Sequence, residues 1–157
     1  MSIMTAEIVI RAATPEDFDS LYALGLATPE LKVSATEAFA DPPEFRRALT
    51  NPDGVFLVAE QRGKPVGFVY ATITDPEILT QPTACIIYIA VDRAARGKGV
   101  GTKLYVDIER RLRERGIAYI YALANTDSAA VQSLFEKMGM KKGHTTVWMD
   151  KRLDQKQ

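Results

Sequence analysis

The chain has 157 residues, 46% of them hydrophobic and 25% charged, which are ordinary values for a globular protein able to bury a core. Its 20 basic and 20 acidic residues balance, so no net positive field points to nucleic acid or to an anionic membrane. A single cysteine excludes an internal disulfide, and no run approaches the ~18 apolar residues of a membrane span. The N-terminal residues also lack the pattern of a signal peptide. We therefore expect one cytoplasmic domain over residues 1–157, without nucleic acid or membrane as partner.

The first half of the sequence predicts two helices and three strands. Thr14-Pro15-Glu16-Asp17 has the pattern of a helix start: a capping threonine, an early proline and acids at the positive end. Asp41-Pro42-Pro43-Glu44 repeats this pattern before a second helix. Turn residues then bracket two strands of a hairpin. The predicted elements are a strand at 7–11, helices from 14 and from 41 to 49, and strands at 55–60 and 66–74.

The second half begins with residues 84–91, which are apolar at every position and therefore predict a central strand buried on both faces. From Thr102 onward the period becomes helical, and Gly116 has the place of a C-terminal glycine. The remaining predicted elements are a strand at 118–124, a helix at 126–138 and an edge strand at 145–152. A helix between the strands at 84–91 and 118–124 is typical of a crossover, which makes those strands parallel.

A glycine-rich link, Arg96-Gly97-Lys98-Gly99-Val100-Gly101-Thr102, joins the central strand to its helix. Glycines permit a positive φ and let an anion approach backbone N–H groups. The first turn of a helix also leaves about four N–H groups unpaired, which favours a phosphate. The alternative is a structural turn with solvated charges. The spacing fits neither G-x-x-x-x-G-K-[ST] nor G-x-G-x-x-G, so nucleotide-binding domains of other classes are disfavoured.

The arrangement Arg96-x-x-Gly99-x-Gly101, after a strand that ends at Val91, resembles the coenzyme A signature R/Q-x-x-G-x-G/A of the GCN5-related N-acetyltransferases (GNAT superfamily). The stretch SLFEKMGM, residues 133–140, is similar to the end of the last helix in that family. The resemblance implies an α/β (α+β) fold. Its mixed, mostly antiparallel central sheet would have splayed parallel strands 4 and 5, with helices on both faces. The family usually closes with two strands, of which this sequence predicts one.

The resemblance implies an acetyl-CoA-dependent N-acetyltransferase. It would move an acetyl group to a primary amine of a small molecule or peptide, by direct transfer in a ternary complex. Backbone N–H groups near residues 89–91 would stabilise the oxyanion. The acceptor would be lined by residues 22–39, the loop 75–83 and the last strand. The resemblance also allows a homodimer but does not require one. The residues that the resemblance assigns to the cofactor are Ile89, Val91, Arg96, Gly97, Lys98, Gly99, Val100, Gly101, Thr102, Asn125 and Ser128.

The catalytic residues are not assigned by this resemblance. Cys85 and Leu123 stand at the two positions where some relatives carry a glutamate that acts as the general base. Phe135 stands where many relatives carry a tyrosine that acts as the general acid. The weak candidates are Tyr88 and Glu77, whose simpler interpretations are a packed aromatic residue and a solvated loop acid. These departures motivate the alternative of a catalytically silent acyl-CoA-binding module.

His144 is the only histidine, so we expect no metal site. A nucleophilic pair of Cys85 with His144 is less favoured than Cys85 as a small core residue. Trp148, on the predicted last strand, would cover either the site or an interface between subunits.

Overall fold

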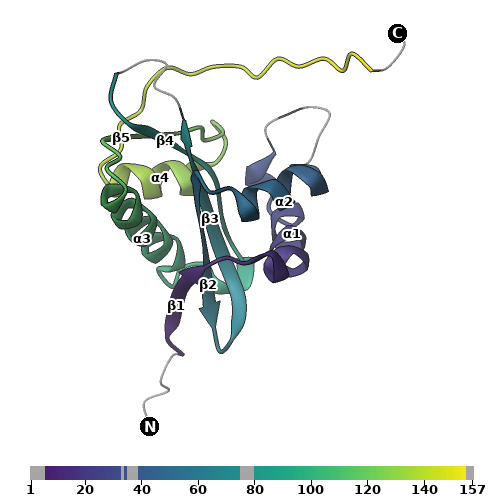
Figure 1. The fold of residues 1–157 in the computed structure, drawn as a ribbon, viewed down its shortest axis with the longest axis vertical. Coiled ribbons are helices and arrows are strands. Elements are labelled where there is room, and N and C mark those ends of the chain that lie inside the picture. Colours follow the sequence, from purple (N-terminus) through teal and green to yellow (C-terminus); the bar gives the residue numbers. More distant parts are fainter. Residues whose placement is uncertain (1–5, 33, 35–38, 75–79, 155–157) are drawn as a thin grey trace.

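The computed structural model describes residues 6–32, 34, 39–74 and 80–154, which form a central sheet with helices on both faces (Figure 1). The strands are β1 (Ile8–Ala12), β2 (Gly54–Gln61), β3 (Lys64–Thr74), β4 (Thr83–Val91) and β5 (Tyr119–Ala122). The α-helices are α1 (Phe18–Leu26), α2 (Pro42–Thr50), α3 (Val100–Glu114) and α4 (Ala129–Lys137). Three short 3-10 helices are η1 (Pro15–Asp17), η2 (Pro29–Leu31) and η3 (Arg93–Ala95). No helix of these described segments is long and apolar enough to span a bilayer.

The sheet has the strand order β1-β2-β3-β4-β5, in which the first three pairings are antiparallel and β4–β5 is parallel. Helix α3 makes the predicted crossover between the two parallel strands. Their pairing runs only from Thr83 opposite Tyr119 to Ile86 opposite Ala122, whereas β4 continues to Val91. The predicted mixed sheet and the separation of its fourth and fifth strands are therefore confirmed, and a slot opens between the strands beyond Ile86.

A β-bulge lies in β4 at the point where this slot begins. Tyr70 of β3 is opposite Tyr88 and the next residue, Ala71, is opposite Ile86, so Ile87 has no partner on β3. The Ile87 side chain is 41% exposed although both neighbours in the strand are buried. A bulge bends its strand and increases the local twist, which explains why β4 turns away from β5 at this residue.

The two faces of the sheet carry different cores (Figure 1). Helices α3 and α4 cover one face with a mainly aliphatic cluster that includes Leu104, Ile108 and Leu112. Helices α1 and α2 cover the other face with an aromatic cluster around Phe45, whose side chain is fully buried. Six rings have centroids 5.5–6.0 Å from that of Phe45, at mostly tilted or edge-on angles. Such arrangements suit the ring quadrupole, so this face is closely packed.

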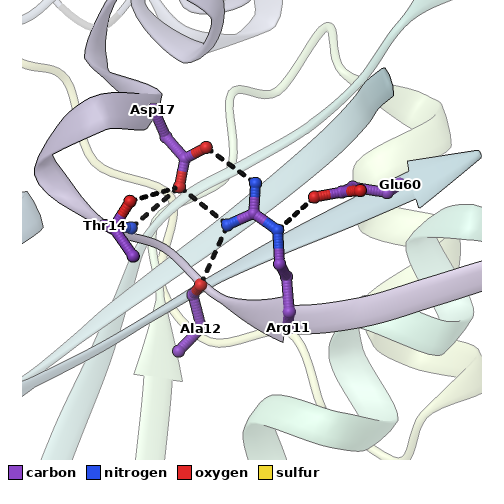
Figure 2. Close-up of polar contacts among 5 residues, drawn as sticks. All are labelled: Arg11, Ala12, Thr14, Asp17 and Glu60. Carbon is purple, nitrogen blue, oxygen red and sulfur yellow. Dashed lines mark hydrogen bonds and ion pairs between the residues drawn. The ribbon is translucent and has the colours of Figure 1, made fainter. Parts of the chain in front are cut away.

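A network of charges holds β1 to the start of the first helix (Figure 2). The Arg11 guanidinium donates to both oxygens of Asp17, at 2.7 and 2.8 Å, and its Nε donates to Glu60 of β2. Asp17 also accepts from the Thr14 N–H at 2.8 Å. The hydrogen bonds from Arg11 are the main cause of a lowered pKa at Asp17. The capping pattern seen in the sequence thus fixes where the chain leaves the sheet.

The predicted edge strand at residues 145–152 is wrong. Every residue from Lys141 to Asp154 is exposed and none of them lies in a strand. The segment leaves the end of α4 and passes beyond the upper end of the molecule (yellow in Figure 1), where the Ser34 hydroxyl donates to Asp150. Alternation of apolar residues predicts one apolar face but supplies no neighbouring strand, and the segment has none among the residues that the structure describes.

Candidate cofactor and acceptor site

The link between β4 and α3 folds into a short series of turns. The Asp92 N–H donates to the Val66 carbonyl at 2.8 Å, and the Asp92 carboxylate accepts from the Ala94 N–H at 3.0 Å, which caps η3. Gly97 and Gly99 then take left-handed backbone conformations, with φ of +79° and +80°. Non-glycine residues rarely adopt this conformation, so the sequence prediction of special backbone geometry is confirmed at these two positions.

Helix α3 begins with unpaired N–H groups. Its first hydrogen bond runs from the Lys103 N–H to the Gly99 carbonyl at 3.1 Å, and Gly99 has no side chain with which to cap the helix. The N–H groups of Val100, Gly101 and Thr102 therefore have no partner within the helix. Because the helix dipole adds positive potential at this end, the loop is chemically suited to a phosphate group.

Gly101 differs from the other two glycines of this loop. It lies within α3 and has no positive φ, so the expectation of special backbone freedom is wrong at this position. A Cβ atom there would lie 3.2 Å from Cδ2 of Leu134 on α4. The missing side chain at Gly101 instead allows α3 and α4 to approach closely beside the loop.

The slot between β4 and β5 is nearly closed in this structure. A cavity of about 30 Å³ lies in it, with room for about one or two water molecules. A wider cavity of about 520 Å³ opens beside it. The smaller cavity is lined by Glu30, Leu31, Ile86, Ile87, Ile89, Leu123, Ala124, Asn125, Ser128, Val131 and Phe135. The larger cavity is lined by Pro29, Glu30, Lys32, Ser34, Asn125, Asp127 and Ser128.

The η2 segment crosses this slot and is held from both sides. On the β4 side, Arg96 forms an ion pair with Glu30 at 3.2 Å, while its Nε donates to the Val91 carbonyl at 3.1 Å. On the β5 side, the Asn125 amide donates to the carbonyls of Glu30 at 3.1 Å and Lys32 at 2.7 Å. Two residues that the resemblance assigns to the cofactor are therefore engaged with η2.

Glu30 lies within residues 22–39, which the sequence interpretation expects to line the acceptor, but that interpretation does not single it out. Its Oε2 atom is buried without a hydrogen-bond partner. Hydrogen bonding to its own backbone, followed by the charge of Arg96, keeps the pKa of Glu30 below its ordinary value, so this carboxylate is ionised. Thr28-Pro29-Glu30 repeats the pattern of Thr14-Pro15-Glu16, which predicts a turn. The contact with Arg96 spans 66 residues, and no local pattern indicates it.

Tyr88, the described catalytic candidate, lies in the aromatic cluster. Tyr88 is only 8% exposed, and its ring centroid lies 5.2 Å from that of Phe39 and 5.8 Å from that of Tyr70. Burial is the main cause of a raised pKa at Tyr88, so the hydroxyl keeps its proton at neutral pH. In that state Tyr88 can donate a hydrogen bond but is a poor base. Glu77, the other candidate, lies outside the described residues.

The positions at which the family resemblance implies a catalytic acid or base hold other residues here. Cys85 is buried, and burial raises the pKa of its thiol. Leu123 is 67% exposed at the slot, and Phe135 is buried with its ring 6.0 Å from that of Tyr105. His144 is exposed on the segment after α4, so the arrangement gives no support to a nucleophilic pair with Cys85. In the described segments no three His, Cys, Asp or Glu residues gather as a metal site would require.

Comparisons with known proteins identify the class of protein. A sequence model of the acetyltransferase (GNAT) family matches residues 19–140. A mycothiol acetyltransferase from Amycolatopsis mediterranei is 32% identical over 105 residues, 65% of this chain and 35% of the relative. An L-2,4-diaminobutyric acid acetyltransferase from Marinococcus halophilus is 33% identical over 86 residues, 55% of this chain and 48% of that protein. This chain thus spans about a third of the mycothiol enzyme's length and about half of the other's.

A solved structure of similar fold is that of AAC(6')-Iy in complex with a bisubstrate analog, with a TM-score of 0.76 and 16% identity. The match covers 94% of this chain and 99% of that one, and at this identity it shows the fold alone.

The chain belongs to the acetyltransferase (GNAT) family, because the family match covers most of its length. The enzymes of this family transfer an acetyl group from acetyl-CoA. The residues present fit such a cofactor, because the exposed glycine loop and the free N–H groups of α3 stand at one end of the slot between β4 and β5.

Proposed function

We propose that this protein is an acetyl-CoA-dependent N-acetyltransferase that transfers the acetyl group directly to a primary amine in a ternary complex. The observation that carries the proposal is the position of Arg96-x-x-Gly99-x-Gly101 at the mouth of the slot beyond Ile86. A helix end suited to an anion thereby follows the part of β4 that has no partner on β5. A linear cofactor with a phosphate group at one end and a thioester at the other suits this geometry.

The proposal gives the loop and the strand separate roles. The N–H groups of residues 97–102, with the cations Arg96 and Lys98, would bind the pyrophosphate. The free edge of β4, including Ile89 and Val91, would pair with the amide groups of the pantetheine arm as an added strand does. Asn125 and Ser128 would contact the cofactor from the opposite side of the slot, where both line the cavities.

The bulge suggests where the chemistry would occur. Beyond Ile86 the residues of β4 no longer pair with β5, and Ile87, which also has no partner on β3, is the first of them. We therefore place the oxyanion donor close to Ile87, nearer the start of the slot than residues 89–91. Loss of one donor of this kind typically lowers kcat by about 10² to 10³.

Proton transfer is the step for which this chain offers few side chains. An amine with a pKa of about 10.4 is unprotonated in roughly one molecule in 2,500 at pH 7, so a base or a water relay should help. Cys85, Leu123 and Phe135 supply neither a carboxylate nor a hydroxyl at the expected positions. We propose that water removes the proton, and that Tyr88, which retains its own proton, is at most a hydrogen-bond donor.

These substitutions also favour a second candidate function, a domain of the same fold that binds acyl-CoA without turning it over. The two functions differ in the fate of the bound cofactor. An acetyltransferase releases free thiol from acetyl-CoA in the presence of the correct amine. A binding module shows the same affinity but releases none with any amine, polyamine or peptide.

The first experiment is thermal unfolding with and without acetyl-CoA, with ATP and NAD as controls. At about 100 times its Kd a ligand adds about 2.7 kcal/mol, which for a domain of this size raises Tm by roughly 5–10 °C. We expect such a rise with acetyl-CoA alone. No rise would mean that the glycine loop is structural and would remove the basis of both functions. A rise followed by no thiol release from a broad amine panel would favour the binding module.

A further inference from the structure

The η2 segment (Pro29–Leu31) stands in the path proposed for the cofactor. Glu30 and Leu31 line the cavity of about 30 Å³ between β4 and β5, together with Ile87 and Ile89 of the free strand edge. A cavity of this size holds about one or two water molecules. The pantetheine arm is many times larger than that, so it cannot share the slot with η2 in this arrangement.

The contacts that hold η2 are of the same kinds as those proposed for the cofactor. The Glu30 carboxylate binds the Arg96 guanidinium at 3.2 Å, as a phosphate oxygen would. The main-chain carbonyls of Glu30 and Lys32 accept from the Asn125 side chain at 3.1 and 2.7 Å, as an amide carbonyl of the pantetheine arm would. An asparagine side chain has two N–H donors, so η2 leaves none of them for the cofactor.

The two sides of these contacts differ in how firmly they are anchored. Gln132 of α4 donates to the main-chain carbonyl of Asn125 at 2.7 Å, which fixes the β5 side of the slot. The turn of η2 is closed by hydrogen bonds between its own residues, 28–32. Its near end is tied to α1, where the Thr28 hydroxyl donates to the Leu24 carbonyl at 2.7 Å. The turn can therefore leave the slot as a unit, about Thr28, without breaking a hydrogen bond of its own.

The closed arrangement is held only weakly. The side chains of Arg96 and Glu30 are 39% and 28% exposed, and ion pairs of this kind contribute little to stability. The Oε2 atom of Glu30 is buried without a hydrogen-bond partner, which is unfavourable for a charged oxygen. A cofactor that brings a pyrophosphate group to Arg96 can therefore displace η2.

We propose that η2 is an internal competitor of acetyl-CoA, which closes the slot in the free protein and leaves it before the cofactor enters. This inference rests on the proposed function, because the competition is for the slot, for Arg96 and for Asn125. The apparent affinity for acetyl-CoA is then lower than that of the open slot, in proportion to the fraction of molecules that are open. A substitution that weakens the closed arrangement should raise the rate of association. It should leave the rate of dissociation unchanged, because η2 is outside the slot when the cofactor is bound.

Leu31→Ala is the most direct variant, because it changes no charge. It removes an apolar side chain that lines the slot and packs against the aromatic cluster. We expect acetyl-CoA to associate about fivefold faster with this variant and to dissociate at the parent rate. Surface plasmon resonance with the immobilised full chain measures both rates. The matched control is Leu26→Ala, the same change at a position on α1 that is 55% exposed, and it should alter neither rate.

The double variant Glu30→Gln with Leu31→Ala should associate with acetyl-CoA faster than either single variant, and far-UV circular dichroism should show the parent fold in each. Two results would overturn this inference and leave the proposed function standing. One is an association rate that is the same in the parent, Leu31→Ala and the double variant. The other is slower dissociation or weaker binding in Leu31→Ala, which would mean that η2 contacts the bound cofactor. If neither the parent nor the double variant bound acetyl-CoA, the proposed function would fail and this inference with it.

Discussion

The two edge strands of the sheet, β1 and β5, differ in how fully they pair and in the charge that they carry. Strand β1 pairs with β2 over all five of its residues and carries the charges of Arg11 at its surface. Strand β5 pairs over four residues, carries no charged residue and lies beside open grooves. Charge on an edge strand discourages further pairing, whereas an apolar edge invites it. The sheet is therefore closed at β1, whereas the proposed cofactor slot lies beside β5.

The largest expected effect tests the β4–β5 side alone. Gly99→Val puts a branched side chain at a φ of +80°, at a position where an added Cβ meets nothing within 4 Å. We expect acetyl-CoA to bind about 100-fold more weakly, because at least two charge-assisted hydrogen bonds of about 1.5 kcal/mol each would be lost. Isothermal titration calorimetry measures this change.

The matched control for this variant is Gly63→Val in the β2–β3 hairpin. That glycine has a φ of +74° and equal open space around it, but it belongs to a different turn and is not one of the residues proposed to bind the cofactor. Both variants should lose about 1–3 kcal/mol of unfolding free energy through backbone strain. Equal affinity for acetyl-CoA in the two variants would show that the glycine loop does not bind the cofactor.

An intermediate effect tests the β1 side. Asp17→Asn removes the charge that Arg11 binds, and we expect unfolding free energy to fall by about 1–2 kcal/mol, without loss of cofactor affinity. Asp19→Asn, at an exposed position on α1, should change stability much less. Urea denaturation monitored by circular dichroism checks both. A loss of cofactor affinity in Asp17→Asn would mean that the two edges are coupled.

The same pair of residues predicts a pH dependence. The folded-state pKa of Asp17 is lowered, so its stabilisation is complete above the unfolded value of about 3.9 and is lost as pH falls through the lower folded value. The gap in stability between parent and Asp17→Asn should therefore close on acidification below about pH 4. A gap that stays constant through this range would contradict the assignment of the charge interaction.

The smallest effect concerns the η2 segment. Glu30→Gln releases Arg96 from its ion pair and removes a negative charge near the proposed pyrophosphate position. Since such part-exposed pairs contribute about 0.2–1 kcal/mol, acetyl-CoA should bind about 1.4- to fivefold more tightly. Glu16→Gln, in the matching Thr-Pro-Glu turn of η1, is the control and should not change the affinity. Weaker binding in Glu30→Gln would instead make Glu30 a residue that positions Arg96.

Local patterns predicted the part of the structure that depends on neighbours in sequence. The apolar run of β4, the left-handed glycines at 97 and 99 and the helical period after Thr102 each follow from residues a few positions apart. They were sufficient to place the loop at the head of α3. The family resemblance then supplied the separation of β4 from β5, which no single stretch of the sequence indicates.

The features that sequence did not predict depend on distant partners. The ion pair of Glu30 with Arg96 and the contacts of Asn125 with η2 join segments that a linear pattern cannot connect. The strand expected at 145–152 is absent for the same reason, since alternation describes a segment and not its neighbour. Spacing groups Gly101 with the other glycines of the loop, although its close contact is with Leu134 on a different helix.

The bulge at Ile87 also decides which core each half of β4 joins. Ala84 and Ile86 pack in the aliphatic cluster under α3 and α4. Strict alternation would send Tyr88 and Ala90 to that same face, yet both lie in the aromatic cluster under α1 and α2. Because of this one extra residue, the side chains of the β4 residues after Ile87 point to the opposite faces of the sheet from those that regular alternation would give them. A strand that kept Ile87 in regular alternation would drive Tyr88 into the aliphatic layer, whereas deleting Ile87 would leave Tyr88 in the aromatic layer. The bulge therefore decides how the two layers divide a single strand between them.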